Sequence, residues 1–151
     1  MKDEQLSECP VVIRLPLQWG DQDAFGHVNN TIYLRWCETA RVEYLMRIGL
    51  WMISAEGIGP IVASFSCDYR RPLTYPDTVQ VGARVTRIGT SSFRMEHRVV
   101  SESLGVVAAD AHSTIVVLDY KLQKSTPLPE AVRAEIERIE GRKFERPAKP
   151  E

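Results

Sequence analysis

The sequence predicts an α+β fold, in which a curled antiparallel β-sheet of about five strands wraps around one long central α-helix and a short α-helix follows near the C-terminus. Three observations predict this fold. Residues 31–48 have helical periodicity, residues from about 58 onward alternate with a period of two, and the 151 residues contain no repeat or second domain. The helix is apolar over so wide an arc that a sheet must curl around it.

The long helix is predicted from TIYLRWCETARVEYLMRI (31–48), with Asn29 or Asn30 as its N-cap and Gly49 as its C-terminal stop. Its apolar face comprises Tyr33, Cys37, Ala40, Tyr44 and Ile48, and it is widened by Leu34, Trp36, Leu45 and Met46. This width predicts a central helix and not a surface one.

The strands are predicted in order along the chain. The first is VVIRLPLQW (11–19), where Pro16 indicates an edge position or a bulge. Four further runs alternate apolar and polar residues between about 58 and 120, and the turn signals RRPLTYPD, IGTSS and SESLG separate them. Some residues on their nominally outer face are also apolar, which indicates that this face is further buried: Val62, Val100, Val106, Val116 and Leu118.

The ends of the domain follow from composition. PLPEAVRAEIERIEG (127–141) predicts a short amphipathic helix. We therefore divide the chain into an N-terminal tail (1–9), a single domain (10–141) and a polar C-terminal tail (142–151).

Composition excludes several classes of protein. The chain has 19 Lys and Arg residues and 20 Asp and Glu residues, and this net charge of −1 argues against nucleic acid or an anionic membrane as a partner. The opening MKDEQLSECP lacks the apolar core of a secretory signal, and no segment is long enough to span a bilayer. Cys9, Cys37 and Cys67 match neither a disulfide framework nor a zinc pattern. We expect a cytoplasmic protein without a metal ion.

Polar residues concentrate in WGDQDAFGHVNN (19–30), directly before the long helix. A helix N-terminus presents free backbone N–H groups that can hold an anion or a developing oxyanion. Asp21 and Asp23 are two residues apart and point to opposite sides of an extended chain, so only one can face a given pocket. Gly26 permits a tight bend. The alternative is purely structural, because Asp, Gly and Asn are also common turn residues.

A resemblance favours the chemical interpretation. DQDAFGHVNNTIYLRWCETAR (21–41) resembles the signature D-x-D-x-x-G-H-V-N-N-x-x-Y-L-x-x-x-E-x-A-R of the 4-hydroxybenzoyl-CoA thioesterase-like family of acyl-CoA thioesterases, which have the hotdog fold. Two later segments, DYRRPLTYPDTVQV and RIGTSSFRMEHRV, are similar to an Arg-Pro turn and a Gly-x-Ser-Ser-Phe hairpin of that family. The resemblance covers residues 11–120 and implies hydrolysis of an acyl-CoA to a free acid and CoA.

The resemblance also assigns roles around the helix N-terminus. It makes Asp23 the catalytic carboxylate, which attacks the thioester carbonyl or activates a water molecule. The backbone amide that polarises the carbonyl lies in the Asn29–Asn30–Thr31 region, Asp21 is mainly structural, and Gly26 forms the bend beside the substrate. His27 is an open case, because it either orients Asp23, touches the substrate or hydrogen-bonds within the turn.

Substrate contacts are implied at two later places. Arg70 and Arg71 follow one strand, and Arg87, Ser91 and Ser92 lie in the hairpin, at positions where family members often meet the CoA nucleotide. No cofactor is implied, because CoA is part of the substrate and a thiolate leaves readily without a metal ion.

The resemblance further implies a homodimer, with tetramers common among relatives and with active sites between subunits. Two alternatives remain open. One is an acyl-thioester hydratase or dehydratase on the same fold, although such enzymes usually carry an Asp–His pair that is absent here. The other is a non-catalytic acyl-CoA-binding module.

Other polar residues are assigned structural roles. We expect His97 to be a hydrogen-bonded core histidine, His112 not to bind metal, Glu38 to pair with Arg35 or Arg41, and Cys37 to fill the core. A group of large apolar residues either walls an acyl tunnel or fills the core, and we expect the core for most of them: Trp19, Phe25, Trp36, Trp51 and Met52.

Overall fold

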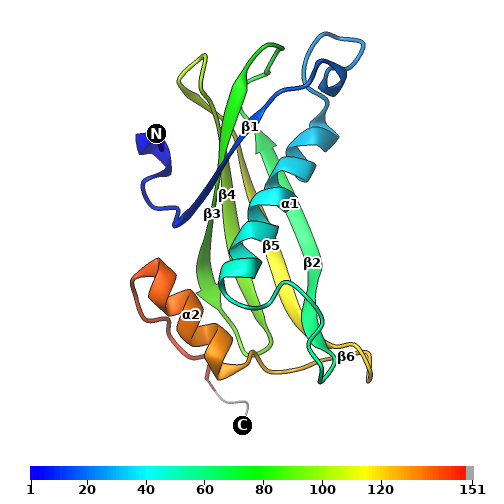
Figure 1. Cartoon of the computed structure of the whole chain (residues 1–151), viewed down its shortest axis with the longest axis vertical. Helices are drawn as coiled ribbons and strands as arrows, with labels where there is room; N and C mark the ends of the chain where they lie inside the picture. The colour runs from blue at the N-terminus through cyan, green and yellow to red at the C-terminus, as the bar shows by residue number, and fades with distance from the viewer. Residues whose placement is uncertain (149–151) are drawn as a thin grey trace.

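The computed structural model describes residues 1–148, and its central feature is one antiparallel sheet that curls around a long helix (Figure 1). The sheet is formed by β1 (Val11–Pro16), β2 (Ile58–Tyr69), β3 (Thr78–Ile88), β4 (Ser92–Ser101), β5 (Val106–Asp119) and the two-residue β6 (Lys124–Ser125). The long strands follow the spatial order β1-β3-β4-β5-β2, and β6 pairs with β5. The predicted α+β class, with about five strands around one helix, is confirmed.

The central helix is α1 (Asn30–Arg47), which agrees with the predicted helix within one residue at each end. Asn29 is the N-cap, and its side-chain oxygen accepts a hydrogen bond from the backbone N–H of Thr31 at 2.9 Å. Gly49 follows the helix with a φ of +75°, which stops it as predicted. Cys37, on the inner face of this helix, is fully buried, and burial raises the pKa of its thiol to about 12, so it is a protonated core residue.

The short helix α2 (Glu130–Glu140) closes part of one sheet edge. β1 pairs with β3 only between Thr78 and Ala83, so the remainder of β3 lacks a strand on that side. There Glu140 accepts a hydrogen bond from the backbone N–H of Val85 at 2.8 Å, and Arg142 donates one to the carbonyl of Thr86 at 3.2 Å. The C-terminal helix therefore satisfies backbone groups that would otherwise remain open.

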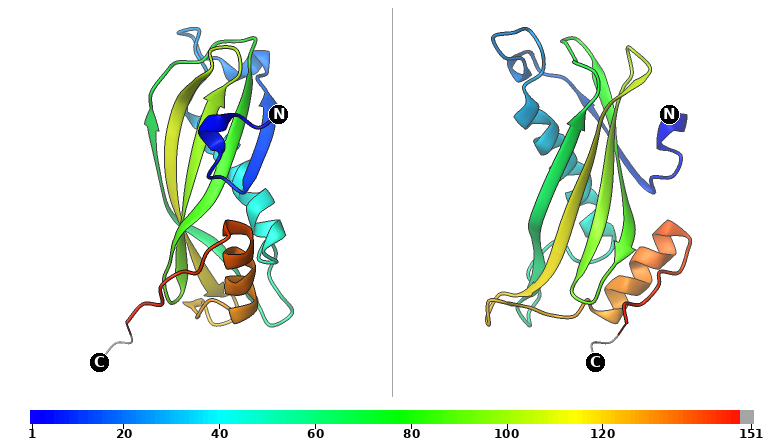
Figure 2. Two further views of the ribbon diagram at one scale, coloured as in Figure 1. Left: turned by 90° about the vertical axis from the view of Figure 1, so that its left-hand side faces the viewer. Right: turned by 180° about the vertical axis from the view of Figure 1, so that it is seen from behind.

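Residues 1–9, which the composition assigned to a tail, lie across the outer face of the sheet (Figure 2). They contain the single-turn helix η1 (Glu4–Leu6), and Leu6 is fully buried with Cys9 against Val100 of β4. Gly82 makes room for this contact, because a Cβ there would lie 2.6 Å from the sulfur of Cys9. Sequence composition missed this packing since a single buried leucine in a polar segment leaves no periodic signal.

The C-terminal tail is also packed as far as it is described. Phe144 is buried against the main core, and its carbonyl accepts a 2.7 Å hydrogen bond from Arg133. Residues 149–151 of the predicted tail lie outside the described residues.

The prediction that most of the large apolar residues near α1 fill the core is wrong. Trp36 is buried, but Trp19, Phe25, Trp51 and Met52 are 73%, 86%, 50% and 61% exposed. These four residues lie in the loops before and after α1, where the single chain has no second layer to cover them. Large exposed apolar groups of this kind mark surfaces that contact something else.

Candidate active site

The polar segment before α1 folds into a compact loop that ends on the helix. Its first turn is η2 (Trp19–Asp21), in which the side chain of Asp21 accepts a hydrogen bond from the backbone N–H of Gln18 at 2.8 Å. The carbonyl of Asp21 also accepts one from the backbone N–H of Asn29 at 2.9 Å. Asp21 thus ties the start of the loop to the cap of α1, which agrees with the structural role that we expected for it.

Asp23 begins a tight turn, and only one of its carboxylate oxygens is engaged. Oδ1 accepts a 2.9 Å hydrogen bond from the backbone N–H of Phe25, and the carbonyl accepts one from Gly26 at 3.1 Å. Gly26 has a φ of +80°, a conformation that favours glycine. Within residues 1–148 the Oδ2 atom has no hydrogen-bond donor, and no cation lies within 4.0 Å of the carboxylate. The half-exposed carboxylate is therefore held by one oxygen and available through the other.

At the start of α1, one backbone amide is free. The N–H of Thr31 is already bonded to the side chain of Asn29, whose Oδ1 also accepts the Thr31 hydroxyl at 2.8 Å. The N–H of Ile32 donates to the Asn29 carbonyl at 3.0 Å. The exposed N–H of Asn30 has no acceptor among the described residues, so it is the amide that can receive a ligand oxygen.

Contacts from distant parts of the chain fix this loop. The hydroxyl of Tyr69, at the end of β2, donates to the carbonyl of Asn30 at 3.0 Å. The N–H of Val28 donates to the carbonyl of Leu73 at 2.8 Å, on the segment that follows β2. The predictions from sequence did not include Tyr69, although its alternation with Cys67 placed both on the inner face of a strand.

His27 takes no part in holding Asp23 through its side chain. The backbone carbonyl of His27 accepts a hydrogen bond from the N–H of Asp23 at 2.9 Å, but the exposed imidazole has no partner within residues 1–148. Of the three expected roles of His27, only contact with a substrate is compatible with an exposed imidazole that has no hydrogen-bond partner among the described residues.

The five residues expected near the CoA nucleotide fall into two separate groups. Arg70 and Arg71 follow β2, at the same end of the sheet as Asp23, whereas Arg87, Ser91 and Ser92 lie at the opposite end (Figure 1). β3 alone spans roughly 33 Å between these ends. One chain therefore cannot use both groups on a CoA bound at Asp23.

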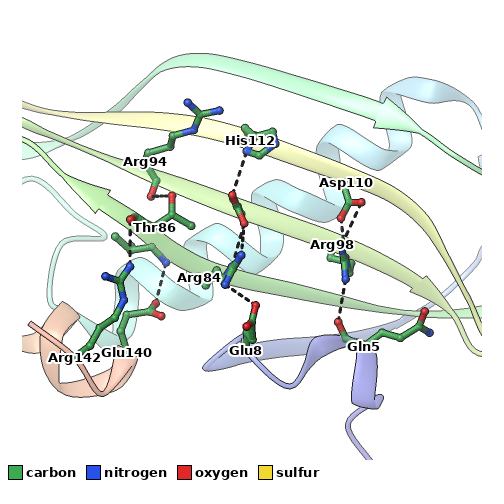
Figure 3. A network of polar contacts seen from close by, with 12 residues as sticks. Gln5, Glu8, Arg84, Thr86, Arg94, Arg98, Asp110, His112, Glu140 and Arg142 are labelled. Carbon is green, nitrogen blue, oxygen red and sulfur yellow. Dashed lines mark hydrogen bonds and ion pairs between the residues drawn. The ribbon is translucent and has the colours of Figure 1, made fainter. Parts of the chain in front are cut away.

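Most arginines on the outer face of the sheet are already paired with acids (Figure 3). The carboxylate of Asp110 binds Arg70 at 2.8 Å and Arg98 at 2.7 Å, and its pKa is lowered by these two cations against the opposing effect of burial. Arg84 binds Glu96 at 2.6 Å. Arg70 is thus turned toward the outer face, and only Arg71 of this pair has no side-chain partner among the described residues.

Two buried polar side chains lie between α1 and the sheet. His97 bonds Ser113 at 3.0 Å through Nε2, but its Nδ1 and the Nη1 atom of Arg41 have no partner among the described residues. Burial, with a smaller contribution from Arg41, lowers the pKa of His97 to about 3, so this histidine is neutral. His97 is a core residue as expected, though only half of its hydrogen-bonding capacity is met. Glu38 lies 3.8 Å from Arg41, which confirms the expected pairing.

Neither a metal-binding cluster nor a membrane-spanning helix is found among the described residues. The described residues contain no group of three or more His, Cys, Asp or Glu side chains arranged to hold a metal ion. His112 lies beside Glu96, with 3.8 Å between Nδ1 and Oε1. Neither helix in the described part of the chain has the length and apolar character that a membrane crossing requires.

The curled sheet around one helix, with a polar loop at the helix N-terminus, places this protein in the hotdog class. Residues 17–136 match the family model of the thioesterase-like superfamily. The chain belongs to this superfamily and is an enzyme of the thioesterase class.

Individual relatives agree with this assignment. The long-chain acyl-CoA thioesterase FadM of Escherichia coli is 31% identical over 119 residues, which cover 78% of this chain and 89% of FadM. A thioesterase from Thermus thermophilus, solved in complex with coenzyme A and Zn, is 38% identical with a TM-score of 0.79, covering 89% of this chain and 98% of that one. PA2801, a putative thioesterase from Pseudomonas aeruginosa, is 34% identical with a TM-score of 0.76, covering 85% and 98%.

Proposed function

We propose that this protein hydrolyses acyl-CoA thioesters to a free acid and CoA, with Asp23 as its catalytic carboxylate. One observation carries the proposal: Asp23 keeps a free carboxylate oxygen on the loop that ends at α1, where the N–H of Asn30 is also free. A carboxylate beside a polarising amide is the minimum that acyl transfer from a thioester requires.

In the proposed reaction, the thioester carbonyl oxygen accepts a hydrogen bond from the N–H of Asn30. The helix dipole and this amide stabilise the negative charge that develops on the oxygen. Asp23 either attacks the carbonyl carbon, giving an anhydride that water then cleaves, or takes a proton from an attacking water. The CoA thiolate leaves and is protonated, so the reaction consumes one water molecule and needs no metal ion or further cofactor.

Other residues act on this pair indirectly. Thr31 and Asn29 hold the first turn of α1 through their mutual hydrogen bonds, and Tyr69 holds the Asn30 carbonyl. Gly26 allows the tight turn of the loop beside Asp23, because it adopts a φ of +80°. In this proposal the exposed side chain of His27 contacts the substrate. In this proposal Thr31 positions the helix start, because its own N–H is already occupied.

A second copy of the chain completes the site. β2 is a twelve-residue edge strand, and Ile61 and Val62 are both exposed although they point to opposite faces. Antiparallel pairing of two β2 edges about a two-fold axis would extend the sheet across the dimer. It would also bring the exposed residues after α1 of one copy toward the Asp23 end of the other, because β2 runs between those two ends. A tetramer would pair two such dimers.

The acyl group would then lie against apolar side chains that the single chain leaves exposed. A cytoplasmic location fits the three cysteines, which are all free thiols.

The test compares the wild type with Asp23→Asn on short, long and aromatic acyl-CoAs, using a thiol-detecting reagent. Asparagine keeps the oxygen that accepts the N–H of Phe25, so the turn should remain intact. We expect a loss of roughly 10²–10⁴-fold in turnover, which is typical for removal of an acid–base group. Glu4→Gln, at an exposed position in η1, is the matched control.

Equal rates for Asp23→Asn and wild type would exclude Asp23 as the catalytic group. Tight binding of acyl-CoA without any turnover by the wild type would instead indicate a binding module. Hydration of an enoyl-CoA in place of hydrolysis would indicate a hydratase.

A further inference from the structure

A small pocket lies between the N-terminal segment and the outer face of the sheet, the face that is turned away from α1 (Figure 3). We call it the outer pocket, and its volume is about 260 Å³. Residues of the segment 5–9 form one wall, and outward side chains of β3, β4 and β5 form the other. The N-terminal wall lies outside residues 17–136, which match the superfamily model, so membership of the superfamily does not account for this pocket.

The N-terminal wall is held in a fixed position on the sheet. Leu6 is fully buried, and the carboxylate of Glu8 binds Arg84 of β3 at 2.7 Å. The backbone carbonyl of Gln5 accepts a hydrogen bond from Arg98 of β4 at 3.4 Å. The outer pocket is therefore formed by the folded single chain and requires no second copy.

One half of the outer pocket has an excess of negative charge. Glu96 and Glu8 bind Arg84 at 2.6 and 2.7 Å, so two carboxylates share one guanidinium group. Both acids use Oε2 for this contact. Among the described residues the Oε1 atom of Glu96 has no hydrogen-bond donor, because Nδ1 of His112 lies 3.8 Å away, beyond hydrogen-bonding distance. This half therefore keeps one unmatched negative charge and free carboxylate oxygens.

The other half of the outer pocket has an excess of positive charge. The carboxylate of Asp110 binds Arg98 at 2.7 Å and Arg70 at 2.8 Å, so two guanidinium groups share one carboxylate. Arg70 makes this contact through Nε, and its two terminal nitrogens have no acceptor among the described residues. One positive charge is therefore unmatched, and guanidinium N–H groups remain free to bind an anion.

The two halves are neighbours along the strands. Glu96 and Arg98 are two residues apart on β4, so they project to the same face about 7 Å from each other. On β5, His112 opposes Glu96 and Asp110 opposes Arg98. The outer pocket thus carries one unmatched charge of each sign at a defined spacing. This pattern is complementary to a molecule that has a cation at one end and an anion at the other.

We propose that the outer pocket binds a small zwitterion of the ω-amino acid type, whose ammonium group pairs with Glu96 and Glu8 and whose carboxylate pairs with Arg70 and Arg98. An ammonium group has three N–H donors for the free carboxylate oxygens, and guanidinium groups bind a carboxylate through paired hydrogen bonds. Drug-sized ligands occupy sites of about 300–1,000 Å³, so the smaller outer pocket suits a ligand of only a few atoms. Because it opens on the face opposite α1, this site is separate from the proposed hydrolysis.

The test follows the imidazole signals of the full-length protein by NMR while ω-amino acids of increasing length are added, from β-alanine to 6-aminohexanoate. The chain has three histidines, and His112 lines the outer pocket whereas His27 lies in the loop before α1. We expect a saturable shift of the His112 signal, which is assigned with His112→Gln, and no shift of the His27 signal. Because the ligand is small, its dissociation constant should be about 1 mM.

Chain length and charge sharpen the test. We expect 5-aminopentanoate to bind best, because its extended chain separates the two charged groups by roughly 7 Å, the spacing of Glu96 and Arg98 along β4. Pentanoate and pentylamine have the same chain but only one charge each, and both should bind roughly tenfold more weakly. Equal binding of these two compounds and the zwitterion would overturn the proposal.

Two substitutions remove one partner at each end of the ligand. Glu8→Gln and Arg70→Gln change side chains that are 76% and 53% exposed, so the fold should be retained. Each should weaken the binding of 5-aminopentanoate roughly tenfold. Glu135→Gln is the matched control, because Glu135 pairs with Arg138 at 2.7 Å outside the outer pocket, and it should leave binding unchanged. Unchanged affinity in both pocket variants, or no saturable shift of His112 with any ligand of the series, would refute the site.

Discussion

The two edges of the sheet are completed in different ways. On the β3 side the chain closes its own edge: β1 pairs with part of β3, and Glu140 and Arg142 satisfy the backbone beyond it. On the β2 side the described residues provide no further strand, and residues 61–64 are exposed on both faces. One edge is therefore finished by segments of the same chain, whereas the other is prepared for a contact that the single chain cannot make.

The core contains both satisfied and unsatisfied buried polar groups. At the β3 edge, the hydroxyl of Tyr44 donates to Glu140 at 2.5 Å, and burial raises the pKa of Glu140. Between α1 and the sheet, Arg41 and His97 each keep a buried polar atom without a partner among the described residues. Buried polar groups are usually paired, so these two atoms are exceptions within the core.

The strongest test of the difference between the two sheet edges prevents pairing at the β2 edge. Ile61→Lys with Val62→Lys places two charges on β2, a substitution that natural edge strands use to prevent pairing. We expect the wild type to sediment as a dimer or larger assembly, and the variant as a monomer with hydrolysis reduced by roughly 10²-fold, comparable to the loss of a catalytic group.

Leu104→Lys is the control for that experiment, because Leu104 is an exposed apolar residue in the turn before β5. It should leave both the assembly and the rate unchanged. A wild type that is monomeric and fully active would show that the β2 edge has no role in the site.

The closed edge should be sensitive to a single half-buried carboxylate, that of Glu140. Glu140→Ala removes the acceptor of both the Tyr44 hydroxyl and the N–H of Val85, and each buried donor left alone costs about 1–3 kcal/mol. We expect the free energy of unfolding in urea to fall by about 3 kcal/mol. Glu135→Ala, which removes only an exposed pair with Arg138, should cost less than about 1 kcal/mol. Equal losses in the two variants would contradict this account of the edge.

A smaller effect on stability concerns His97, the buried histidine of β4. The pKa of His97 is about 3 in the folded chain and near 6.5 when unfolded, so below pH 6.5 the unfolded chain binds one more proton. Stability should therefore fall as the pH decreases from 6.5 toward 3, by up to about 1.4 kcal/mol per pH unit, or about 2 kcal/mol by pH 5.

His97→Gln should remove this part of the slope when urea unfolding is compared between pH 7 and pH 5. His27→Gln, at an exposed position, controls for the loss of a histidine elsewhere. Parallel pH profiles for His97→Gln and wild type would show that the buried imidazole does not govern the acid sensitivity.

Most of the fold was predictable because it depends on local patterns. The helical period, the Asn29 cap and Gly49 set α1 to within one residue, and the alternation of period two gave the long strands. The turn at Asp23 and Gly26 was also predictable from residue types, since an Asp side chain bonds the backbone two residues later and a glycine accepts a positive φ.

The candidate site was predictable in position but not in detail. The sequence placed Asp23 beside the start of α1, but it could not show that the N–H of Thr31 is occupied or that Tyr69 fixes the helix start. Nor could it show that Arg87, near the end of β3, lies at the opposite end of the sheet from the loop that precedes α1. These facts depend on side chains whose partners are far apart in the sequence.

By itself, the sequence determined the α+β class, the central helix with its ends, the positions of the strands along the chain and the polar loop at the helix start. Each of these features arises from interactions among residues within a few positions of one another. Only the tertiary structure decided that residues 1–9 cover the outer face, that Trp19 and Phe25 are exposed, and that one sheet edge is closed while the other is open. Burial and edge pairing depend on which distant segments meet, and hydrophobicity along the chain does not specify those partners.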